Sequence, residues 1–292
     1  MPEEENSLGF SQKQLMFIRN FCAKLSQKPR FPPSRFHKES PYLRKQTTLE
    51  VINRAFTKRV ITGPYLYCNT NIEVELIDNL EKPIEYWKEH KDDPGVNFCL
   101  ALRGDWSYIC FKKGASMLDY TGTPLPSYPA LCRIEDIYFE EEGLLPRDKY
   151  PHGWDDNDWL VYNAMREARK KTYRELEKEL GFSMITVRNH YLRIIKQCKS
   201  LVCFFPNSFD GYQYILLTFR TKYEIGLEKS LSKLDRTTYL YKSNGLIILH
   251  LQVDPEAQEY NKATSRFGEL EEMGIIHDLR VSVPNRWKNI HA

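Results

Sequence analysis

The chain has 292 residues, of which 41% are hydrophobic and 13% aromatic, so it is long enough for about two domains with sizeable cores. Its acidic start does not resemble a secretory signal, and apolar runs such as Leu246–Leu249 are too short to span a bilayer. These features predict a soluble, cytoplasmic protein without a membrane partner.

The net charge is only +3, but it is distributed unevenly along the chain. Residues 11–62 contain 12 basic and 2 acidic side chains, whereas residues 63–150 contain 9 basic and 16 acidic ones. A one-sided basic segment is the usual electrostatic footprint of a polyanion partner. The alternative is a helical module that packs in the core and exposes a solvated basic face.

The seven cysteines form no Cys-x-x-Cys pair and no Cys/His cluster with zinc-finger spacing, so no metal site is predicted. Most of them are expected to be buried structural thiols. Cys198 and Cys203, five residues apart across a helix end, remain a candidate redox pair.

Residues 10–68 predict a degenerate helix-turn-helix with helices over 11–25, 33–38 and 47–59. Several prolines interrupt its second helix, which favours phosphate contacts over base recognition. The helix over 47–59 aligns with the later segment 183–195. The DNA-contacting candidates in this first module are Thr48, Asn53, Arg54, Lys58 and Arg59.

Residues 69–140 predict a truncated αβ module. Strands are expected over 71–77, 96–102, 106–111 and 133–139, and a helix over 83–89. A loop with Pro and Gly, over 119–129, stands where a second helix would be expected. Residues 141–154 predict a linker.

Residues 155–205 give the most specific pattern, a winged helix-turn-helix. Helices are expected over 155–169, 172–180 and 183–196, and Gly181 lies in the short turn that joins the last two. Ile185, Leu192 and other apolar residues are expected to face the core. A hairpin of strands over 201–205 and from 212 onward is the candidate wing.

The last of these helices is the candidate recognition helix, because such a turn lets the second helix enter a DNA major groove. Arg and Asn make the best bidentate contacts to guanine and adenine. The DNA-binding candidates are Tyr173, Ser183, Met184, Thr186, Arg188, Asn189 and Arg193. The alternative is an ordinary helical hairpin with a solvated charged face.

Residues 206–292 predict the order β-α-β-β-α-β, which is the ferredoxin-like arrangement. Strands are expected over 212–219, 237–241, 246–253 and 275–283, and helices over 223–233 and 255–273. The fold class is therefore α+β, with a helix-turn-helix and a ferredoxin-like module present twice.

The run Arg103-Gly104-Asp105-Trp106, in a hairpin of such a module after a helix-turn-helix, resembles the Lrp/AsnC (feast/famine) transcription regulators. The resemblance implies a transcription regulator that binds double-stranded DNA. It also implies that Gly104 and Asp105 contact a small effector such as an amino acid. Members of the family pair through their αβ modules, so the chain is expected to self-associate or to pair its two halves internally.

Two other classes remain open. Sirohaem decarboxylases resemble the same architecture, and His37, His190 and His250 would then be candidate acids or haem-facing groups. Paired carboxylates, a Gly-rich phosphate loop and a Ser/His/Asp order are all missing from the sequence, so no catalytic residue and no cofactor are predicted. The third class is a protein-interaction scaffold that does not bind DNA.

Overall fold

Helices and antiparallel strands alternate along the chain in the computed structural model, which describes residues 5–114 and 118–289 and only the backbone of 287–289. The predicted α+β class is confirmed. The chain forms two compact units, and each draws on both halves of the sequence. Unit 1 comprises the described residues up to Cys68, with Leu125–Pro129 and Pro151–Asp210; unit 2 comprises Asn69–Pro124, Ala130–Tyr150 and the described residues from Gly211 on.

The first helical module of unit 1 contains α1 (Gln12–Gln27), α2 (Pro33–Phe36) and α3 (Lys45–Thr57). The side chain of Ser11 caps α1 through the backbone N–H of Gln14, whose own side chain accepts from the N–H of Ser11. A 3₁₀ turn, η1 (His37–Glu39), follows α2. The core of this module is rich in aromatic side chains, including Phe10, Phe17, Phe21 and Phe36.

The second helical module contains α5 (Asp156–Ala164), α6 (Tyr173–Leu180) and α7 (Met184–Ile194). Its first helix is shorter than the predicted 155–169, because the chain turns after Ala164 into a loop before α6. The two predicted helices around the Gly181 turn are confirmed. A 3₁₀ turn, η3 (Ile195–Gln197), ends the module.

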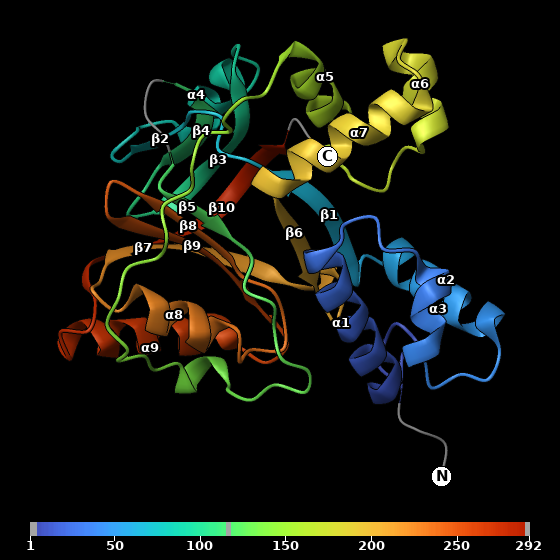
Figure 1. Cartoon of the computed structure of the whole chain (residues 1–292). Helices are drawn as coiled ribbons and strands as arrows, with labels where there is room; N and C mark the ends of the chain where they lie inside the picture. The colour runs from blue at the N-terminus through green and yellow to red at the C-terminus, as the bar shows by residue number, and fades with distance from the viewer. Residues whose placement is uncertain (1–4, 115–117, 290–292) are drawn as a thin grey trace. The chain divides into compact units, whose positions relative to one another are not determined.

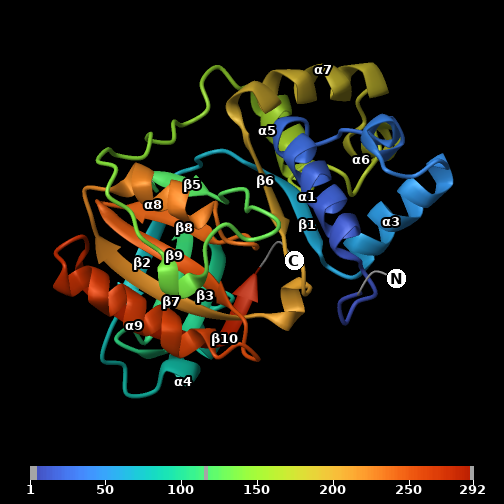
Figure 2. The ribbon, with the colours of Figure 1, turned by 90° about the horizontal axis from the view of Figure 1, so that it is seen from below.

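An antiparallel ribbon of two strands joins the modules: β1 (Ile61–Tyr67) and β6 (Lys199–Phe204) lie side by side (Figure 1 and Figure 2). Ile61 and Phe204, at one end of the ribbon, belong to the core of the first module. Leu66 and Cys68, at the other end, belong to the core of the second module.

The predicted wing is wrong, because β6 does not form a hairpin with the strand that follows it. Its ladder partner is β1 of the first half, whereas β7 (Gln213–Arg220) pairs with strands of unit 2. The β6 strand has only one partner in the described residues, and that partner is more than 130 residues earlier in the sequence.

Unit 2 is an eight-stranded antiparallel sheet in the order β2-β4-β3-β10-β7-β9-β8-β5. The second half contributes β7, α8 (Glu224–Leu231), β8 (Tyr239–Ser243), β9 (Leu246–Val253), α9 (Glu259–Glu272) and β10 (His277–Asn289). Both helices cover one face of the sheet (Figure 1). Their apolar sides, which include Phe267 of α9, pack on alternate residues of β7 and β9 such as Leu217 and Leu249.

The first half contributes β2 (Ile72–Ile77), α4 (Pro83–His90), β3 (Val96–Gly104) and β4 (Tyr108–Lys113). The described residues between β4 and β5 contain no helix. The chain instead crosses to the second half, where β5 (Tyr120–Gly122) pairs with β8.

The predicted strand over 133–139 is wrong. The segment contains the 3₁₀ turn η2 (Ile134–Asp136), and Ile134, Ile137 and Phe139 pack into the core under α9. The spacing of these side chains resembles that of a strand. In the structure they fill the space between α9 and the sheet, and their backbone does not pair with a neighbouring strand.

Candidate nucleic-acid interface

One face of α7 is exposed along the length of the helix. Side chains recur on it every three to four residues, as a single helical face requires. Those exposed are Met184, Ile185, Arg188, Asn189, Leu192, Arg193 and, just beyond the helix, Lys196. The opposite face is buried and carries Val187, Tyr191 and Ile194.

The core assignment of two apolar residues on α7 is therefore wrong. Ile185 is 69% exposed and Leu192 is 47% exposed, and Met184 beside them is 48% exposed. Their helical spacing from the buried residues places them on the outer side, and apolar character alone did not reveal this. Sequence reasoning thus missed that the candidate recognition face is half apolar.

The start of α7 is fixed by backbone and side-chain hydrogen bonds. Gly181 ends α6 with a left-handed φ of 72°, which a residue with a Cβ rarely adopts. Ser183 Oγ accepts from the N–H of Thr186 at 3.1 Å, and the two hydroxyls are 2.8 Å apart. The predicted DNA contacts Ser183 and Thr186 thus serve first as the cap of the helix.

A buried carboxylate holds α7 against α5. Asp158 is fully buried and accepts from His190 Nδ1 at 2.8 Å and from Arg193 Nε at 2.8 Å. Arg193 Nη2 also donates to Asp155 at 2.6 Å, and this bond lowers the pKa of the Asp155 carboxyl. The predicted base contact of Arg193 stays a prediction, and in this structure its guanidinium binds the two aspartates.

The ligand atoms of Asp155, Asp158 and His190 lie within 4.8 Å of one another, close enough to share a metal ion. The guanidinium of Arg193 already contacts both carboxylates. It therefore supplies the positive charge that two neighbouring aspartates require.

Tyr173 lies at the junction of the two helical modules. The guanidinium of Arg30 lies 4.4 Å from the centre of its ring and donates to the backbone oxygens of Ala168 and Lys171 at 2.7 and 2.9 Å. In the opposite direction, Arg169 donates to the Phe31 oxygen at 2.7 Å. The prediction that Tyr173 contacts DNA is corrected, because its half-buried ring packs between the modules.

Two predicted contacts on α3 are also structural. Thr48 is fully buried, and its hydroxyl lies 2.8 Å from both His37 Nδ1 and Ser40 Oγ, so it cannot reach a base. Arg54 lies over the ring of Phe10 at 4.2 Å and donates to oxygens of the segment before and within α1. Both assignments are therefore corrected.

The remaining candidates of the first module reach the surface. Asn53 and Lys58 are exposed, whereas Arg59 is half-exposed, lies over Phe209 and pairs with Asp210 at 2.5 Å. Exposed cations surround the start of α3 and its end, namely Arg35, Lys38, Arg44, Lys45 and Lys58.

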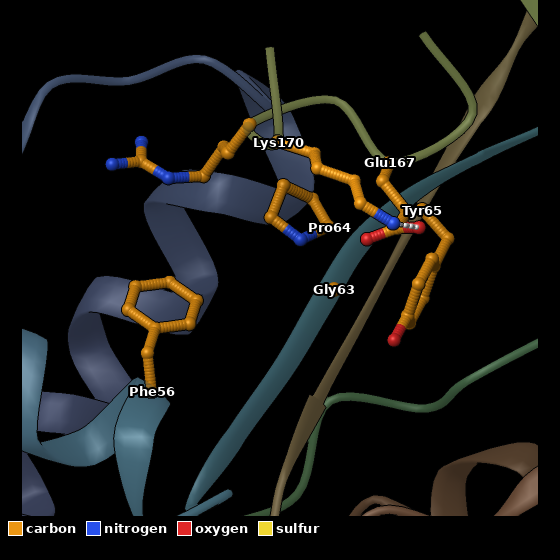
Figure 3. Close-up of a pocket in the computed structure, with 7 residues that line it drawn as sticks. Phe56, Gly63, Pro64, Tyr65, Glu167 and Lys170 are labelled. Atoms are coloured by element: carbon orange, nitrogen blue, oxygen red, sulfur yellow. Dashed lines mark hydrogen bonds and ion pairs between the residues drawn. The ribbon is translucent and has the colours of Figure 1, made fainter. Parts of the chain in front are cut away.

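A hollow of about 320 Å³ opens where β1 meets the loop before α6 (Figure 3). Phe56, Tyr65 and Pro64 line it together with Lys170, which pairs with Glu167 at 2.7 Å.

The predicted effector residues Gly104 and Asp105 lie where β3 of the first half pairs with β10 of the second half. Gly104 has a φ of 122°, and a Cβ there would lie 2.3 Å from the backbone oxygen of Val281 on β10. The Asp105 carboxylate accepts from the N–H of Val281 at 2.7 Å. Trp106 Nε1 donates to Thr218 Oγ1 at 2.8 Å. Gly104 and Asp105 thus hold β10 in place, and their predicted contact with an effector stays a prediction.

A second hollow, of about 370 Å³, lies beside α4 and is lined by residues of β2, β3 and β4 in unit 2. The stacked rings of Tyr86 and His90, with centroids 4.0 Å apart, line it. Lys112 and Glu75 also line it and pair at 2.7 Å.

The histidines proposed for an enzyme are engaged in packing. His37 and His190 bind Thr48 and Asp158, as described above. His250 is buried among the rings of Phe98, Tyr214 and Tyr241, and burial lowers its pKa to about 4. The imidazole of His250 is therefore neutral over the physiological pH range.

In the described part of the chain, none of the helices has the length and apolar character needed to cross a membrane. Comparisons of the chain with protein-family models, with curated proteins and with solved structures found no significant match.

Proposed function

We propose that this chain is a cytoplasmic, sequence-specific DNA-binding transcription regulator whose recognition helix is α7. The observation that carries the proposal is the outer face of this helix. Arg188 and Asn189 stand exposed at its centre, with apolar side chains on both sides. Arg and Asn recognise guanine and adenine edges, and apolar groups contact the thymine methyl, so such a face matches a major groove.

The rigidity of the helix supports the same proposal. Base recognition requires that the side chains be held in one position relative to the duplex. The Ser183 cap fixes the start of α7, and the Asp158 contacts fix its last turns. Arg174, Lys178 and Lys196 are exposed cations near it that would contact phosphates.

The first module has a different role in this proposal. Its α3 helix buries Thr48 and commits Arg54 to packing, whereas the exposed cations around it remain accessible. We assign these cations, with Asn53, to phosphate contacts that do not depend on base sequence.

The proposal includes a relationship to the Lrp/AsnC regulators at the level of architecture. The order β10-β7-β9-β8 in unit 2, with two helices on one face, supports this part of the proposal, because it is the order expected of a ferredoxin-like module. The pairs β1–β6 and β3–β10 connect the two halves of the chain. We infer that one chain makes internally the contacts that two subunits would otherwise make, so a native-mass measurement should detect mainly monomer.

We place a small effector in the hollow beside α4 instead of at Gly104. The ion pair of Lys112 and Glu75 offers one charge of each sign, and the ring of Tyr86 offers an apolar wall. This set suits a zwitterion such as an amino acid. Thermal melting with each common amino acid tests the assignment, and Lys112→Ala should abolish any shift that is found.

Binding selection from random duplexes, repeated at two salt concentrations, tests the proposed function. Enrichment of a defined sequence is expected. Replacing Arg188 and Asn189 together by Ala should weaken cognate binding by about 2–4 kcal/mol, roughly 30- to 1,000-fold. Replacing Asn261 and Lys262 by Ala is the matched control, because both are exposed on α9 of unit 2. Equal losses in both variants would contradict the assignment of α7.

A protein-interaction scaffold is the second candidate, and the exposed apolar side chains of α7 favour it. Three such side chains on one helix are also what a partner protein would bury. Absence of any duplex binding at low salt would favour this candidate over the regulator. Visible absorption with added sirohaem then tests the tetrapyrrole enzyme.

A further inference from the structure

Two cysteines from opposite halves of the chain face each other at one end of the ribbon in unit 1. The ladder pairs Leu66 with Ser200 and Tyr67 with Lys199. The next step in the same register brings Cys68, which follows β1, opposite Cys198, which precedes β6. Both sulfurs belong to the core of the second module.

The backbone hydrogen bonds show which kind of ladder position this is. The N–H of Leu66 donates to the Arg166 oxygen at 2.7 Å, and the N–H of Cys68 donates to the Tyr162 hydroxyl at 3.3 Å. Both groups therefore point away from β6. Positions of this kind are non-hydrogen-bonded pairs, with Cα atoms about 4.5 Å apart and side chains close together. That separation falls within the range of about 4.4–6.8 Å that a disulfide spans.

The two thiols differ in environment. The hydrogen bond from Cys198 lowers the pKa of the Cys68 thiol, which increases its thiolate fraction. The same contact and burial raise the pKa of Cys198, so this thiol keeps its proton. Cys198 is partly exposed, whereas Cys68 is only 3% exposed, so solvent reaches the pair from the Cys198 side.

We propose that Cys68 and Cys198 are a reversible oxidation site, at which a peroxide produces a disulfide that joins the two halves of unit 1. The Cys68 thiolate attacks one oxygen of hydrogen peroxide, which gives a sulfenic acid and releases hydroxide. The Cys198 sulfur then attacks the Cys68 sulfur, an S–S bond forms, and the sulfenic oxygen leaves as water with the thiol proton. Overall two thiols are oxidised and one peroxide is reduced to two waters.

A second pair in unit 2 provides an internal comparison. Cys99 on β3 and Cys110 on β4 are direct ladder partners as well. Both are essentially inaccessible, at 0% and 1% exposed, and burial raises the pKa of Cys110 to about 11. Similar backbone geometry is therefore combined with two thiols of which neither reaches the surface, whereas Cys198 in the first pair is partly exposed. Oxidation is expected at Cys68 and Cys198 first.

The full-length protein treated with hydrogen peroxide and then denatured tests the proposal. Free thiols should fall from seven to five, and a reductant should restore them. Peptide mass mapping should find the peptide with Cys68 linked to the peptide with Cys198. This mapping needs no variant, so it stands even where a substitution impairs folding.

Three variants sharpen the result. Cys68→Ser should keep six free thiols under the same treatment, because the thiol that attacks the peroxide is gone. Cys198→Ser should lose only the Cys68 thiol, fall from six free thiols to five, and form no linkage, because no second sulfur is present to displace the sulfenic oxygen. Cys132→Ser, a half-buried control, should fall from six thiols to four. A linkage between other cysteines, over-oxidation of Cys68 without a linkage, or seven intact thiols would each overturn the proposal. None of these outcomes depends on whether the protein binds DNA.

Discussion

The two helical modules of unit 1 follow one plan but use it differently. In each, the third helix precedes a ribbon strand, and the aligned residues Val51 and Val187 are both buried. One turn earlier the modules diverge. Thr48 is fully buried on α3, whereas the aligned Met184 is 48% exposed on α7. At this position the corresponding helix is therefore packed into the core in the first module and exposed to solvent in the second.

The source of stability differs as well. The first module packs aromatic rings, as in the stacked pair Phe17 and Phe36, with centroids 4.9 Å apart. The second module relies on a buried carboxylate, Asp158, that joins α5 to α7. A module that exposes one face of its third helix to solvent buries less apolar surface along that helix. We infer that the polar contact compensates for it.

The largest expected effect is therefore in the second module. Asp158→Ala removes the acceptor of His190 and one of the two acceptors of Arg193, whose guanidinium keeps Asp155. Each hydrogen bond to a charged group contributes about 1.5–3 kcal/mol, so the loss of unfolding free energy should be about 3–5 kcal/mol. Urea denaturation of the full chain measures this loss. Asp156→Ala is the control, because this residue is exposed in the first turn of the same helix and should change stability by less than about 1 kcal/mol.

If Asp158→Ala and Asp156→Ala lowered stability equally, the buried carboxylate would not be what holds α7. The comparison between an aromatic and an ionic module would then have to be abandoned.

In unit 2 the two halves of the chain meet in one aromatic cluster. The first half contributes Phe98 to it, and the second half contributes His250. Burial lowers the pKa of His250 from 6.5 to about 4, so the unfolded chain binds the proton more tightly than the folded protein. Stability is complete above pH 6.5 and falls as the pH decreases towards 4. The full loss is about 3 kcal/mol.

Chemical denaturation at pH 7 and pH 4 measures this effect. In His250→Leu, the acid-induced loss should be smaller than in the unmodified protein by about 3 kcal/mol. His152→Leu, at an exposed position, should retain the full loss. Identical pH profiles for all three proteins would show that His250 titrates normally.

The corresponding hairpin turns of the two halves give a third test. Gly104 and Gly245 both have a positive φ, but only at Gly104 does the built Cβ meet backbone, that of Val281. Gly104→Ala should cost about 2–3 kcal/mol, from strain and from displacement of β10. Gly245→Ala should cost about 1 kcal/mol, from strain alone. Thermal denaturation distinguishes them, and equal costs would show that the β3–β10 joint yields easily.

Local patterns in the sequence predicted most of the helices and strands. The helices around Gly181 were recognisable because a cap, a left-handed glycine and apolar spacing all lie within 25 residues. The order of elements in the second half was likewise recognisable from periodicity and from the Asn244-Gly245 turn. These signals arise from neighbours in sequence, so they do not require knowledge of the fold.

What the sequence could not predict depends on partners far along the chain. The pairing of β1 with β6, and hence the error about a wing, involves strands from different halves. The burial of Thr48 and the commitment of Arg193 depend on which side chains surround them. Seven of the twelve predicted DNA contacts are buried or engaged in this way, namely Thr48, Arg54, Arg59, Tyr173, Ser183, Thr186 and Arg193. Residue type identified polar candidates, but it did not distinguish side chains that pack inside the protein from those that are exposed at its surface.

The smallest expected effect tests the central comparison most directly, at the aligned positions 48 and 184. Thr48→Val removes the hydroxyl near His37 and Ser40 and should lower stability by about 1 kcal/mol, with unchanged affinity for duplex DNA. Met184→Ala should leave stability within about 0.5 kcal/mol, because the side chain is half-exposed, and should weaken cognate binding. Thermal denaturation and duplex titration of both variants measure the two quantities. The reverse pattern, with binding lost at Thr48 and stability lost at Met184, would mean that α3 rather than α7 is the helix that reads the DNA.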